Sequence, residues 1–338
     1  MIGRQTHKPE NNGSSTVVAL CGGIGGAKLA LGLYRVLDPH TLTLIINTGD
    51  DFEHLGLHIS PDIDTVTYTL ADKNNLETGW GHRDDTWNFM SALAELNGET
   101  WFALGDRDLA IHVERSRRLR SDERLGEITA DITRKYGIDA SLLPMSDDPA
   151  GTIIQTSIGH LTFQDYFVRM KSEPVVERVS YKEAEAAIPN AEVLSALHQS
   201  ELRCIVVCPS NPFLSINPIL AVPGIREAMQ ASPAPVVGIS PIIGGQAVKG
   251  PTAKIMAELS LPLTVQTIVE HYDGLLDGYI IDNTDSDVSN EMCIPVMVTK
   301  TLMKSIEDRE ILAREVLAFA DTLSVRGNSS GQIHRKDV

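Results

Sequence analysis

Cysteines and long apolar runs are scarce in this 338-residue sequence. We interpret the cysteines as free thiols, mostly buried, as in a reducing compartment, because they lack the spacing of a zinc site: Cys21, Cys204, Cys208 and Cys293. No apolar run is long enough to span a membrane, and the first residues, MIGRQTHKPENNGSS, lack the apolar region of a signal peptide. These absences predict a cytoplasmic protein that does not act at a membrane.

Basic residues are also in short supply. The sequence has 29 lysines and arginines against 45 aspartates and glutamates, which gives a net charge of −16. Such a chain is unsuited to nonspecific nucleic-acid binding, because that binding depends on a basic surface. To bind phosphate groups it needs a local reversal of charge, by a metal ion or by a few cations such as Lys28, Arg107 and Lys249.

Several common catalytic and binding motifs are missing as well. The sequence contains no H-E-x-x-H or EF-hand loop and no internal repeat. We see no Gly-x-Ser-x-Gly nucleophile elbow either, because the one match to that spacing, Gly327–Gly331, falls in the polar end of the sequence and not between a strand pattern and a helix pattern. An NAD-dependent dehydrogenase is not supported either, because Asn47 stands where an acidic ribose-binding residue would end the second strand. The function must therefore be sought in other stretches.

The most informative stretch is Val17–Lys28, VVALCGGIGGAK. Its apolar run, glycine turn and helix-forming residues predict a strand, a tight loop and the start of a helix. Backbone N–H groups at a helix N-terminus bind anions, and glycines allow a phosphate to approach. The candidate diphosphate-binding residues are therefore Gly22, Gly23, Gly25 and Gly26, with Lys28 nearby. The alternative is a turn without a ligand, because GGIGG lacks the register of G-x-G-x-x-G and the ending of a Walker loop.

The apolar runs predict an α/β fold. Continuous apolar segments bounded by helical patterns are typical of a parallel sheet that is covered on both faces. We expect a first helix at Ala27–Leu37, a last helix at Glu307–Leu323, and strands at Thr16–Cys21, Leu42–Asn47, Arg203–Pro209, Val236–Ser240, Gly278–Asn283 and Pro295–Thr299. The predicted class is a Rossmann-like, mostly parallel sheet with helices on both faces and a largely helical inserted subdomain.

The same patterns predict how the chain is divided. Residues 16–71 and 201–325 form the expected nucleotide-binding core, and residues 72–200 form the insert. Residues 1–15 are expected to be a disordered leader and residues 326–338 a polar tail. The insert is supported by helical periodicity at Asp85–Leu96, Leu109–Arg120 and Glu123–Tyr136, and by a β-hairpin pattern at Thr152–Thr156 and His160–Val168.

Four aspartates, Asp50, Asp51, Asp62 and Asp64, follow the second predicted strand in a long polar loop. Ligands of open α/β sheets bind at the carboxyl ends of the strands, and paired carboxylates there are suitable ligands for magnesium. We predict that Asp50 and Asp51 hold this metal. Two structural alternatives stay open: Asp50 and Asp51 as turn residues, and Asp64 as the N-cap of a helix at Thr65–Ala71.

Two more turns follow predicted strands in the second half of the chain. The first contains candidates for binding a nucleobase or ribose, unless it is an ordinary Asx or Ser turn: Ser210, Asn211, Pro212 and Ser215. The second is glycine-rich and carries a cation: Gly244, Gly245 and Lys249. Two glycine turns at two strand ends favour a nucleotide site more than either does alone.

The predicted insert carries a charged segment, Gly105-Asp106-Arg107-Asp108, after a short apolar run. It is either the edge of a site or a solvated helix start. By their spacing, His112 and Arg115 share a helix face with Asp108. Trp80 and Trp87 would suit the wall of a ligand cavity, but we expect both to pack in the core.

Taken together, these stretches resemble the 2-phospho-L-lactate transferase family (CofD/FbiA), which makes the deazaflavin coenzyme F-420. The matches run in the family's order from residue 16 to residue 325. They are GGIGGAKL, NTGDD, SPDIDTV, GWGHRDDTWN, LGDRDLA, LPMSDDP, FQDYFV, PSNPFLSI and SPIIGGQAVKGP. The GGIGGAK loop resembles the bacterial branch of the family rather than the archaeal one.

The resemblance implies a magnesium-dependent transfer and a homodimer. The ribityl hydroxyl of the deazaflavin Fo would attack a guanosine diphospho ester of a three-carbon acid and release GMP. Under this hypothesis the glycine loop binds the diphosphate, Asp50 and Asp51 bind magnesium, and Asp64 binds the ribityl chain or helps to take its proton. Asp106 and Arg107 would orient substrate charge, and the guanosine would contact Ser210, Asn211 and Ser215. The identity of the three-carbon acid stays open.

The alternative function is a non-catalytic nucleotide-sugar-binding regulator of the gluconeogenesis-factor type. That family is similar in its glycine loop and in an acidic stretch after the second strand. It usually has a serine- and glycine-rich run after its paired aspartates, whereas this chain has FEHLGLHISPDIDT there, and LGDRDLA further on. Both segments favour the transferase.

Overall fold

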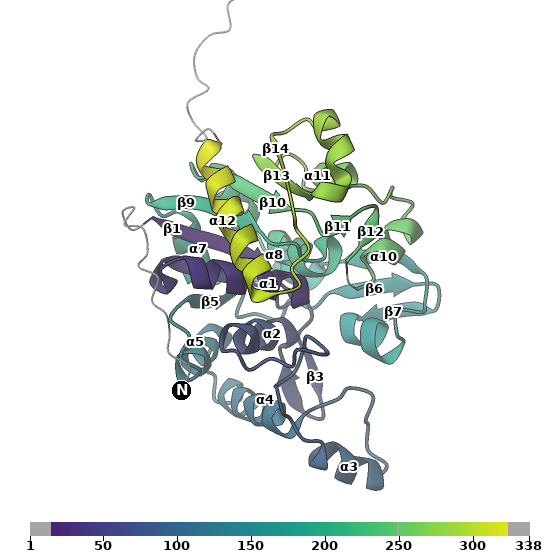
Figure 1. The fold of residues 1–338 in the computed structure, drawn as a ribbon. Helices are drawn as coiled ribbons and strands as arrows, with labels where there is room; N and C mark the ends of the chain where they lie inside the picture. Colours follow the sequence, from purple (N-terminus) through teal and green to yellow (C-terminus); the bar gives the residue numbers. More distant parts are fainter. Residues whose placement is uncertain (1–14, 249, 324–338) are drawn as a thin grey trace, which may run out of the picture.

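The central element of the fold is a seven-stranded parallel sheet (Figure 1). The structure, a computed structural model, describes residues 15–248 and 250–323, so Lys249, the predicted tail and all of the predicted leader except Ser15 lie outside the described residues. In spatial order the strands are β14 (Val296–Thr299), β13 (Gly278–Asp282), β10 (Val236–Ile239), β9 (Leu202–Val207), β1 (Thr16–Cys21), β2 (Leu42–Ile46) and β5 (Ser141–Pro144). This confirms the predicted fold class.

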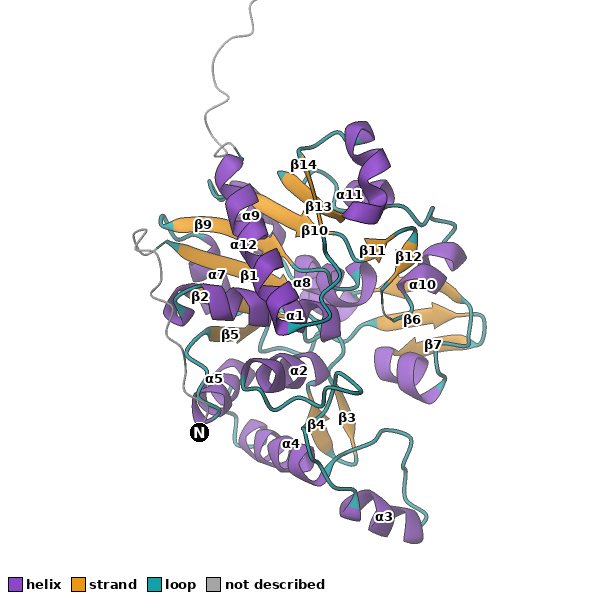
Figure 2. Cartoon of the chain, viewed as in Figure 1, coloured by secondary structure: helices purple, strands orange, loops and turns teal. Residues whose placement is uncertain are grey.

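Helices cover both faces of this sheet (Figure 2). Along β1, Val18 and Leu20 point into one hydrophobic core, and Val17 and Ala19 into the other. Both faces of the strand are therefore buried, which explains its continuous apolar sequence. The core on the Val17 side of the sheet contains residues of four helices: α1 (Gly23–Val36), α2 (Pro61–Leu70), α5 (Leu125–Lys135) and α12 (Ile306–Thr322). The core on the Val18 side contains residues of six helices: α6 (Lys182–Ala186), α7 (Ala191–Leu197), α8 (Asn217–Ala221), α9 (Ile225–Ala231), α10 (Thr252–Glu258) and α11 (Val265–His271).

The chain changes direction across the sheet beside β1. It adds β2 and β5 on one side of β1, and β9, β10, β13 and β14 on the other. The loops that follow β1 and β9 therefore meet at the carboxyl edge of the sheet, at a topological switch point. Ligands of doubly wound sheets bind at such points.

The expected insert, residues 72–200, is partly integrated into the central sheet. β5 lies within this range and pairs with β2. The sequence of β5, SLLP, has only two aliphatic residues before a proline, so it gives no continuous apolar run. The predicted hairpin is present as β6 (Ile153–Thr156) and β7 (Gly159–Thr162), and β8 (Val176–Ser180) completes a three-stranded antiparallel sheet. The second strand of this hairpin, predicted at His160–Val168, ends earlier than expected, and a π-helical turn at Asp165–Arg169 follows it.

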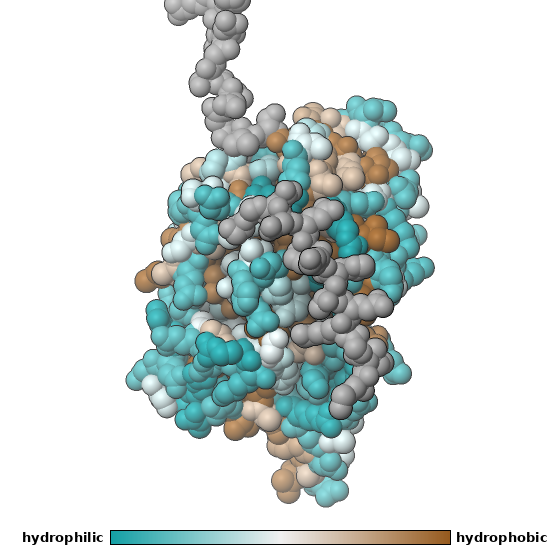
Figure 3. Space-filling model, turned by 60° about the vertical axis from the view of Figure 1, so that its left-hand side comes forward, coloured by the Kyte–Doolittle hydropathy of each residue, from teal (hydrophilic) through white to brown (hydrophobic). Residues whose placement is uncertain are grey.

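The remaining elements are short. α3 (Asn88–Glu95) projects from the body of the protein next to α4 (Asp106–Leu119), and it has no buried residue (Figure 1). Two small antiparallel ribbons are formed by β3 (Phe52–His54) with β4 (Leu57–Ile59), and by β11 (Ile242–Ile243) with β12 (Gln246–Ala247). Within residues 15–248 and 250–323, no helix has the length and apolar character to cross a membrane. Figure 3 shows a mostly hydrophilic face with scattered brown patches.

Candidate functional site

The candidate site lies where the loops after β1, β2 and β9 meet. The Gly22 N–H donates to the Ser210 hydroxyl at 3.2 Å, and this hydroxyl donates to the Gly22 carbonyl at 2.8 Å. Gly25 and Gly26 lie so close to the same loop that a Cβ would overlap the Pro209 carbonyl or the Ser210 hydroxyl. The structure thus brings the predicted glycine loop and the predicted β9 turn together.

Asp62, which we did not predict as a site residue, binds the N-terminus of α1. Its Oδ1 accepts a hydrogen bond from the Gly23 N–H at 2.6 Å, and its Oδ2 accepts one from Asn47 Nδ2 at 2.9 Å. A Cβ at Gly22 would overlap this carboxylate, so only glycine fits there. Asp62 occupies the place that an anion takes at a helix N-terminus. The sequence shows it only as one of four nearby aspartates.

Asn47 connects Asp62 to the predicted metal pair. Its amide nitrogen lies 3.4 Å from Asp50 Oδ1, and its oxygen accepts a hydrogen bond from the Gly49 N–H at 2.8 Å. Asp50 is buried, and its pKa is raised well above the ordinary value, first by burial and then by the charges of Asp62 and Asp51. The loop after β2 therefore places mutually repelling carboxylates beside the glycine loop.

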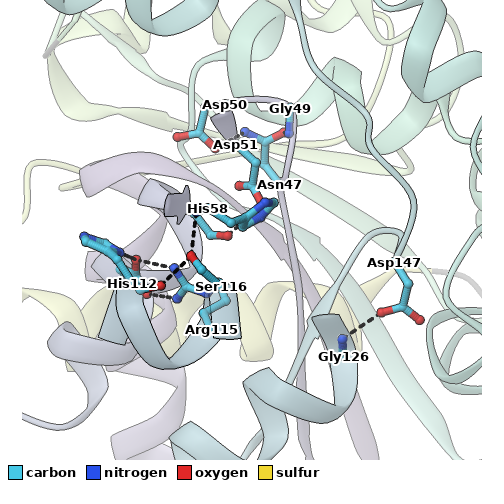
Figure 4. A network of polar contacts seen from close by, with 12 residues as sticks. Asn47, Gly49, Asp50, Asp51, His58, His112, Arg115, Ser116, Gly126 and Asp147 are labelled. Atoms are coloured by element: carbon cyan, nitrogen blue, oxygen red, sulfur yellow. Dashed lines mark hydrogen bonds and ion pairs between the residues drawn. The ribbon is translucent and has the colours of Figure 1, made fainter. Parts of the chain in front are cut away.

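Asp51 has one oxygen that is available to a metal. Its Oδ2 accepts a hydrogen bond from the Ser60 hydroxyl at 2.7 Å and lies 3.1 Å from His58 Nε2. Figure 4 shows Asp51 and His58 next to each other. Its Oδ1 is buried and has no hydrogen-bond partner among the described residues. Burial raises the pKa of Asp51. An unpartnered carboxylate oxygen next to a second buried carboxylate fits a divalent cation.

Asp50 and Asp51 line a cavity of about 420 Å³, which we call the acidic cavity. Part of its wall is aromatic, because Trp101 lies edge-on to His54 with ring centroids 5.0 Å apart. The cavity is lined by Gly49, Asp50, Asp51, Phe52, Glu53, His54, Leu55, Glu99, Trp101, Gly151, Thr152, Ile153, Thr162, Phe163, Gln164, Asp165, Arg169 and Glu183.

Asp64 belongs to a buried ion-pair cluster. Both of its oxygens accept hydrogen bonds from the Arg115 guanidinium, one of them at 3.0 Å, and His112 lies between Asp64 and Asp108, at 3.6 and 3.4 Å. Figure 4 shows Arg115 and His112 side by side. Tyr68 donates a hydrogen bond to Asp108 at 2.5 Å. The predicted shared face of Asp108, His112 and Arg115 is thus confirmed, but its contact with α2 depends on tertiary packing.

The N-cap alternative for Asp64 is wrong. α2 begins at Pro61 after Ser60, which places Asp64 inside the first turn of the helix. Asp64, Asp108 and His112 offer ligand atoms that lie within 4.8 Å of one another. We place no metal there, because the Arg115 guanidinium already compensates the charge of Asp64.

Asp106 and Arg107 begin α4. Asp106 accepts hydrogen bonds from the Thr86 hydroxyl and from the Phe89 and Asn88 N–H groups, which lower its pKa to about 2. It therefore anchors the start of α3. The exposed Arg107 side chain donates a hydrogen bond to the Arg83 carbonyl at 3.4 Å. A contact of either residue with a substrate stays a prediction.

The loop before α3 forms a second cavity, of about 370 Å³, which we call the tryptophan cavity. Trp80 and Trp87 are 45% and 46% exposed, so the expectation that they pack in the core is wrong. A Cβ placed on Gly79 would lie 3.1 Å from the Ile24 side chain, so this loop contacts the glycine loop. The cavity is lined by Asn75, Leu76, Glu77, Thr78, Trp80, Gly81, His82, Arg83, Asp84, Asp85, Trp87, Gly105 and Asp108.

The predicted nucleoside-binding turn has one unused donor. Asn211 Oδ1 accepts hydrogen bonds from the Phe213 and Leu214 N–H groups, and the buried Asn211 Nδ2 has no partner in the described part of the chain. The next two predicted residues of the turn, Pro212 and Ser215, are buried.

The other two predicted anion-binding groups have different surroundings. Gly244 and Gly245 form the exposed tip of the β11–β12 ribbon, where both have positive φ, and the Gly244 N–H donates to Asp285 Oδ2 at 2.9 Å. The Lys28 ammonium group donates to the Met303 carbonyl at 3.2 Å. Their binding of phosphate stays a prediction.

A sequence model of the family described as 2-phospho-L-lactate transferase CofD matches residues 17–312. The chain belongs to this family. It is 39% identical over 315 residues to a phosphoenolpyruvate transferase of Kitasatospora aureofaciens, covering 90% of this chain and 98% of that protein. It is 35% identical over 311 residues to a 2-phospho-L-lactate transferase of Methanocaldococcus jannaschii, covering 91% and 99%.

Among solved structures, this CofD-family chain is similar to a protein of the UPF0052 family from Bacillus halodurans. The TM-score is 0.60 at 15% sequence identity, and the match covers 91% of this chain and all of the other. At this identity the likeness shows the fold alone. Because the family model and the curated relatives are transferases, the regulator alternative is not favoured.

The pH dependence of stability in this CofD-family protein is expected to depend on Asp62. Burial raises its pKa to about 6. The stability that this group contributes is fully present below its unfolded pKa of about 4 and is lost as the pH rises through 6. Asp62 alone should contribute a loss of up to about 3 kcal/mol between pH 4 and pH 7 without metal. Asp62→Asn should lack this share of the loss, while the raised pKa values of Asp50 and Asp51 add to the loss in both proteins. Urea unfolding in chelator measures it.

The matched control is Asp122→Asn, which changes an exposed aspartate. This variant should keep the pH dependence of the wild-type protein. Equal slopes for Asp62→Asn and the wild type would contradict the prediction.

Proposed function

We propose that this CofD-family protein transfers the phospho-three-carbon-acid group of a guanosine diphospho ester to the ribityl hydroxyl of Fo, releases GMP, and so acts in coenzyme F-420 biosynthesis. One observation carries the proposal: the glycine loop, the β9 turn and the Asp50–Asp51 pair meet at one edge of the sheet. Phosphoryl-type transfer depends on positioning and on neutralising charge, and this arrangement supports both.

The glycine loop and the β9 turn would bind the donor. The Gly23 N–H, which now donates to Asp62, would donate to the diphosphate. Ser210, Ser215 and the unpartnered Asn211 Nδ2 would contact the guanosine. Asp50 and Asp51 would hold magnesium, for which the unpartnered Asp51 Oδ1 is suited, and the bound ion would polarise the phosphate.

The tryptophan cavity would bind the acceptor. Trp80 and Trp87 offer exposed aromatic faces for the flat deazaflavin ring, and stacking on such faces is favourable. Asp108 lines this cavity and contacts the Asp64 cluster, so the ribityl chain would extend toward Asp64. Asp64 accepts two bonds from Arg115, and a carboxylate has further lone pairs for a hydroxyl. Asp106 and Arg107 would orient the acceptor at the cavity rim.

We further propose that the three-carbon acid is enolpyruvate. Relatives named phosphoenolpyruvate transferase, from Kitasatospora aureofaciens and Streptomyces coelicolor, are 39% and 37% identical to this chain, and the Methanocaldococcus jannaschii 2-phospho-L-lactate transferase is 35% identical. We also propose that the protein is cytoplasmic and, as the family resemblance implies, a homodimer. Light scattering of the purified protein tests the dimer.

Purified protein given Fo, magnesium and a guanylated donor should release GMP and yield a more acidic deazaflavin. Chromatography measures both products. Comparing the enolpyruvyl, 2-lactyl and 3-phosphoglyceryl-type donors should show the highest kcat/KM for the enolpyruvyl ester. The control reaction contains chelator in place of magnesium and should be inactive. Binding of Fo and donor without GMP release would contradict a transferase and favour a binding protein.

A further inference from the structure

Arg169 is the only lysine or arginine among the described residues that line the acidic cavity. Carboxylates dominate the rest of the polar wall, among them Asp50, Asp51 and Glu183. His54 also lines the cavity, but burial lowers its pKa, so its ring is neutral near pH 7. The permanent positive charge of this cavity is therefore the Arg169 guanidinium.

The Arg169 guanidinium is positioned but not fully bound. It lies over the Trp101 ring, 5.2 Å from the centroid, and this cation–π contact helps to hold it at the cavity wall. Its carboxylate contacts are long, with Nη2 3.5 Å from Glu99 and Nη1 3.4 Å from Asp165. Charge-assisted hydrogen bonds are usually about 2.7–2.9 Å long. The side chain is 46% exposed, so a ligand in the cavity can reach it.

We propose that Arg169 binds the carboxylate of the donor's three-carbon acid, an inference that rests on the proposed function. Every candidate donor carries a carboxylate as well as phosphate groups. The phosphate groups would lie at the Asp50–Asp51 end of the cavity, and the carboxylate would meet repulsion from every acidic residue of the wall. A guanidinium binds a carboxylate through two parallel hydrogen bonds, which a lysine does not offer.

This contact gives Arg169 a defined part in specificity. It would select donors whose esterified group carries a carboxylate over donors in which an uncharged group of similar size takes its place. An uncharged group would leave the guanidinium without its bidentate partner. It would not choose among the three-carbon acids, since all of them present the same carboxylate.

The test compares Arg169→Gln with a matched control, Arg178→Gln. Arg178 is an exposed arginine on β8, in the same small sheet that borders the cavity. A hydrogen bond to a charged group contributes about 1.5–3 kcal/mol, so Arg169→Gln should raise the KM of the donor by about 10- to 100-fold. The KM of Fo and the inhibition constant of GDP, which has no carboxylate, should stay unchanged. Arg178→Gln should match the wild type throughout.

A second donor, the guanosine diphospho ester of isopropyl alcohol, completes a thermodynamic cycle. Wild type and Arg169→Gln should use this neutral ester equally poorly, because removing either partner removes the same contact. An equal loss for acidic and neutral donors, or no loss at all, would overturn the proposal. If Arg169→Gln does not fold, as judged by thermal melting, Arg169→Lys takes its place in the cycle, with a smaller loss expected.

Failure of the proposed function has a different signature. In that case the wild-type protein transfers neither donor to Fo. Calorimetry then measures the affinity of the wild type and of Arg169→Gln for the guanylated acid and for GDP. The inference holds only if the substitution weakens binding of the guanylated acid and leaves binding of GDP unchanged.

Discussion

The Asp50→Asn, Asp51→Asn double variant is expected to lose at least about a thousandfold in kcat, because a bound metal contributes several kcal/mol to charge stabilisation. Two neutral amides in place of buried carboxylates remove the charge that would hold the ion. The measurement is GMP release at saturating donor and Fo. Glu53→Gln is the control, since Glu53 is an exposed acid of the same cavity and should keep most of the activity. Intact transfer by the double variant would refute the metal site.

Thermal melting separates loss of the metal from loss of the fold in this experiment. Burial and neighbouring carboxylates raise the pKa of Asp50, so the charged pair is destabilising without a cation. The double variant should therefore be at least as stable as the metal-free wild type. Magnesium should raise the melting temperature of the wild type and leave that of the variant unchanged.

Replacing Arg115 by methionine is expected to cost about 3–5 kcal/mol in the free energy of unfolding, which is typical when one partner of a buried ion pair is removed. Arg115 is 1% exposed and binds both oxygens of the buried Asp64, so the variant leaves that carboxylate uncompensated between α2 and α4. Chemical denaturation at pH 7 measures the change.

Arg117→Met on the same helix is the control for this loss. Arg117 is 61% exposed and pairs with Glu114, so the change should cost less than about 1 kcal/mol. Adding Asp64→Asn to Arg115→Met should recover part of the loss, because it removes the unpaired charge. If Arg115→Met costs no more than Arg117→Met, the cluster does not stabilise the contact between α2 and α4.

Much of the fold could be predicted from the sequence. Strands buried on both faces give continuous apolar runs, and all the strands that we predicted for the central sheet are present. β5 was missed because its sequence, SLLP, has only two aliphatic residues before a proline. Helix starts and glycine turns are local features as well, so the Gly22–Gly26 loop and the Ser210–Ser215 turn could be placed at strand ends. Their meeting at one edge follows from parallel pairing.

The contacts within the site could not be predicted in the same way. Whether Asp62 or Asp64 faces the glycine loop depends on how α2 rotates against α1, and the sequence gives both residues the same local signal. Asp64 meets Arg115 only because α4 packs on α2. The exposure of Trp80 and Trp87 depends on the path of a loop that has no periodicity. Partners that come from distant segments leave no local pattern.

The pairing of β1 with β9 also has a consequence for biosynthesis. Val17 pairs with Cys204, so β1 cannot pair with β9 until residue 204 has been synthesised and has left the ribosome. At about 5–20 residues per second, that interval is on the order of ten seconds or more. Throughout it the nascent chain presents an unpaired apolar strand edge, the kind of surface that recruits chaperones or aggregates. Crowding of nascent chains during this interval should therefore lower the yield of soluble protein.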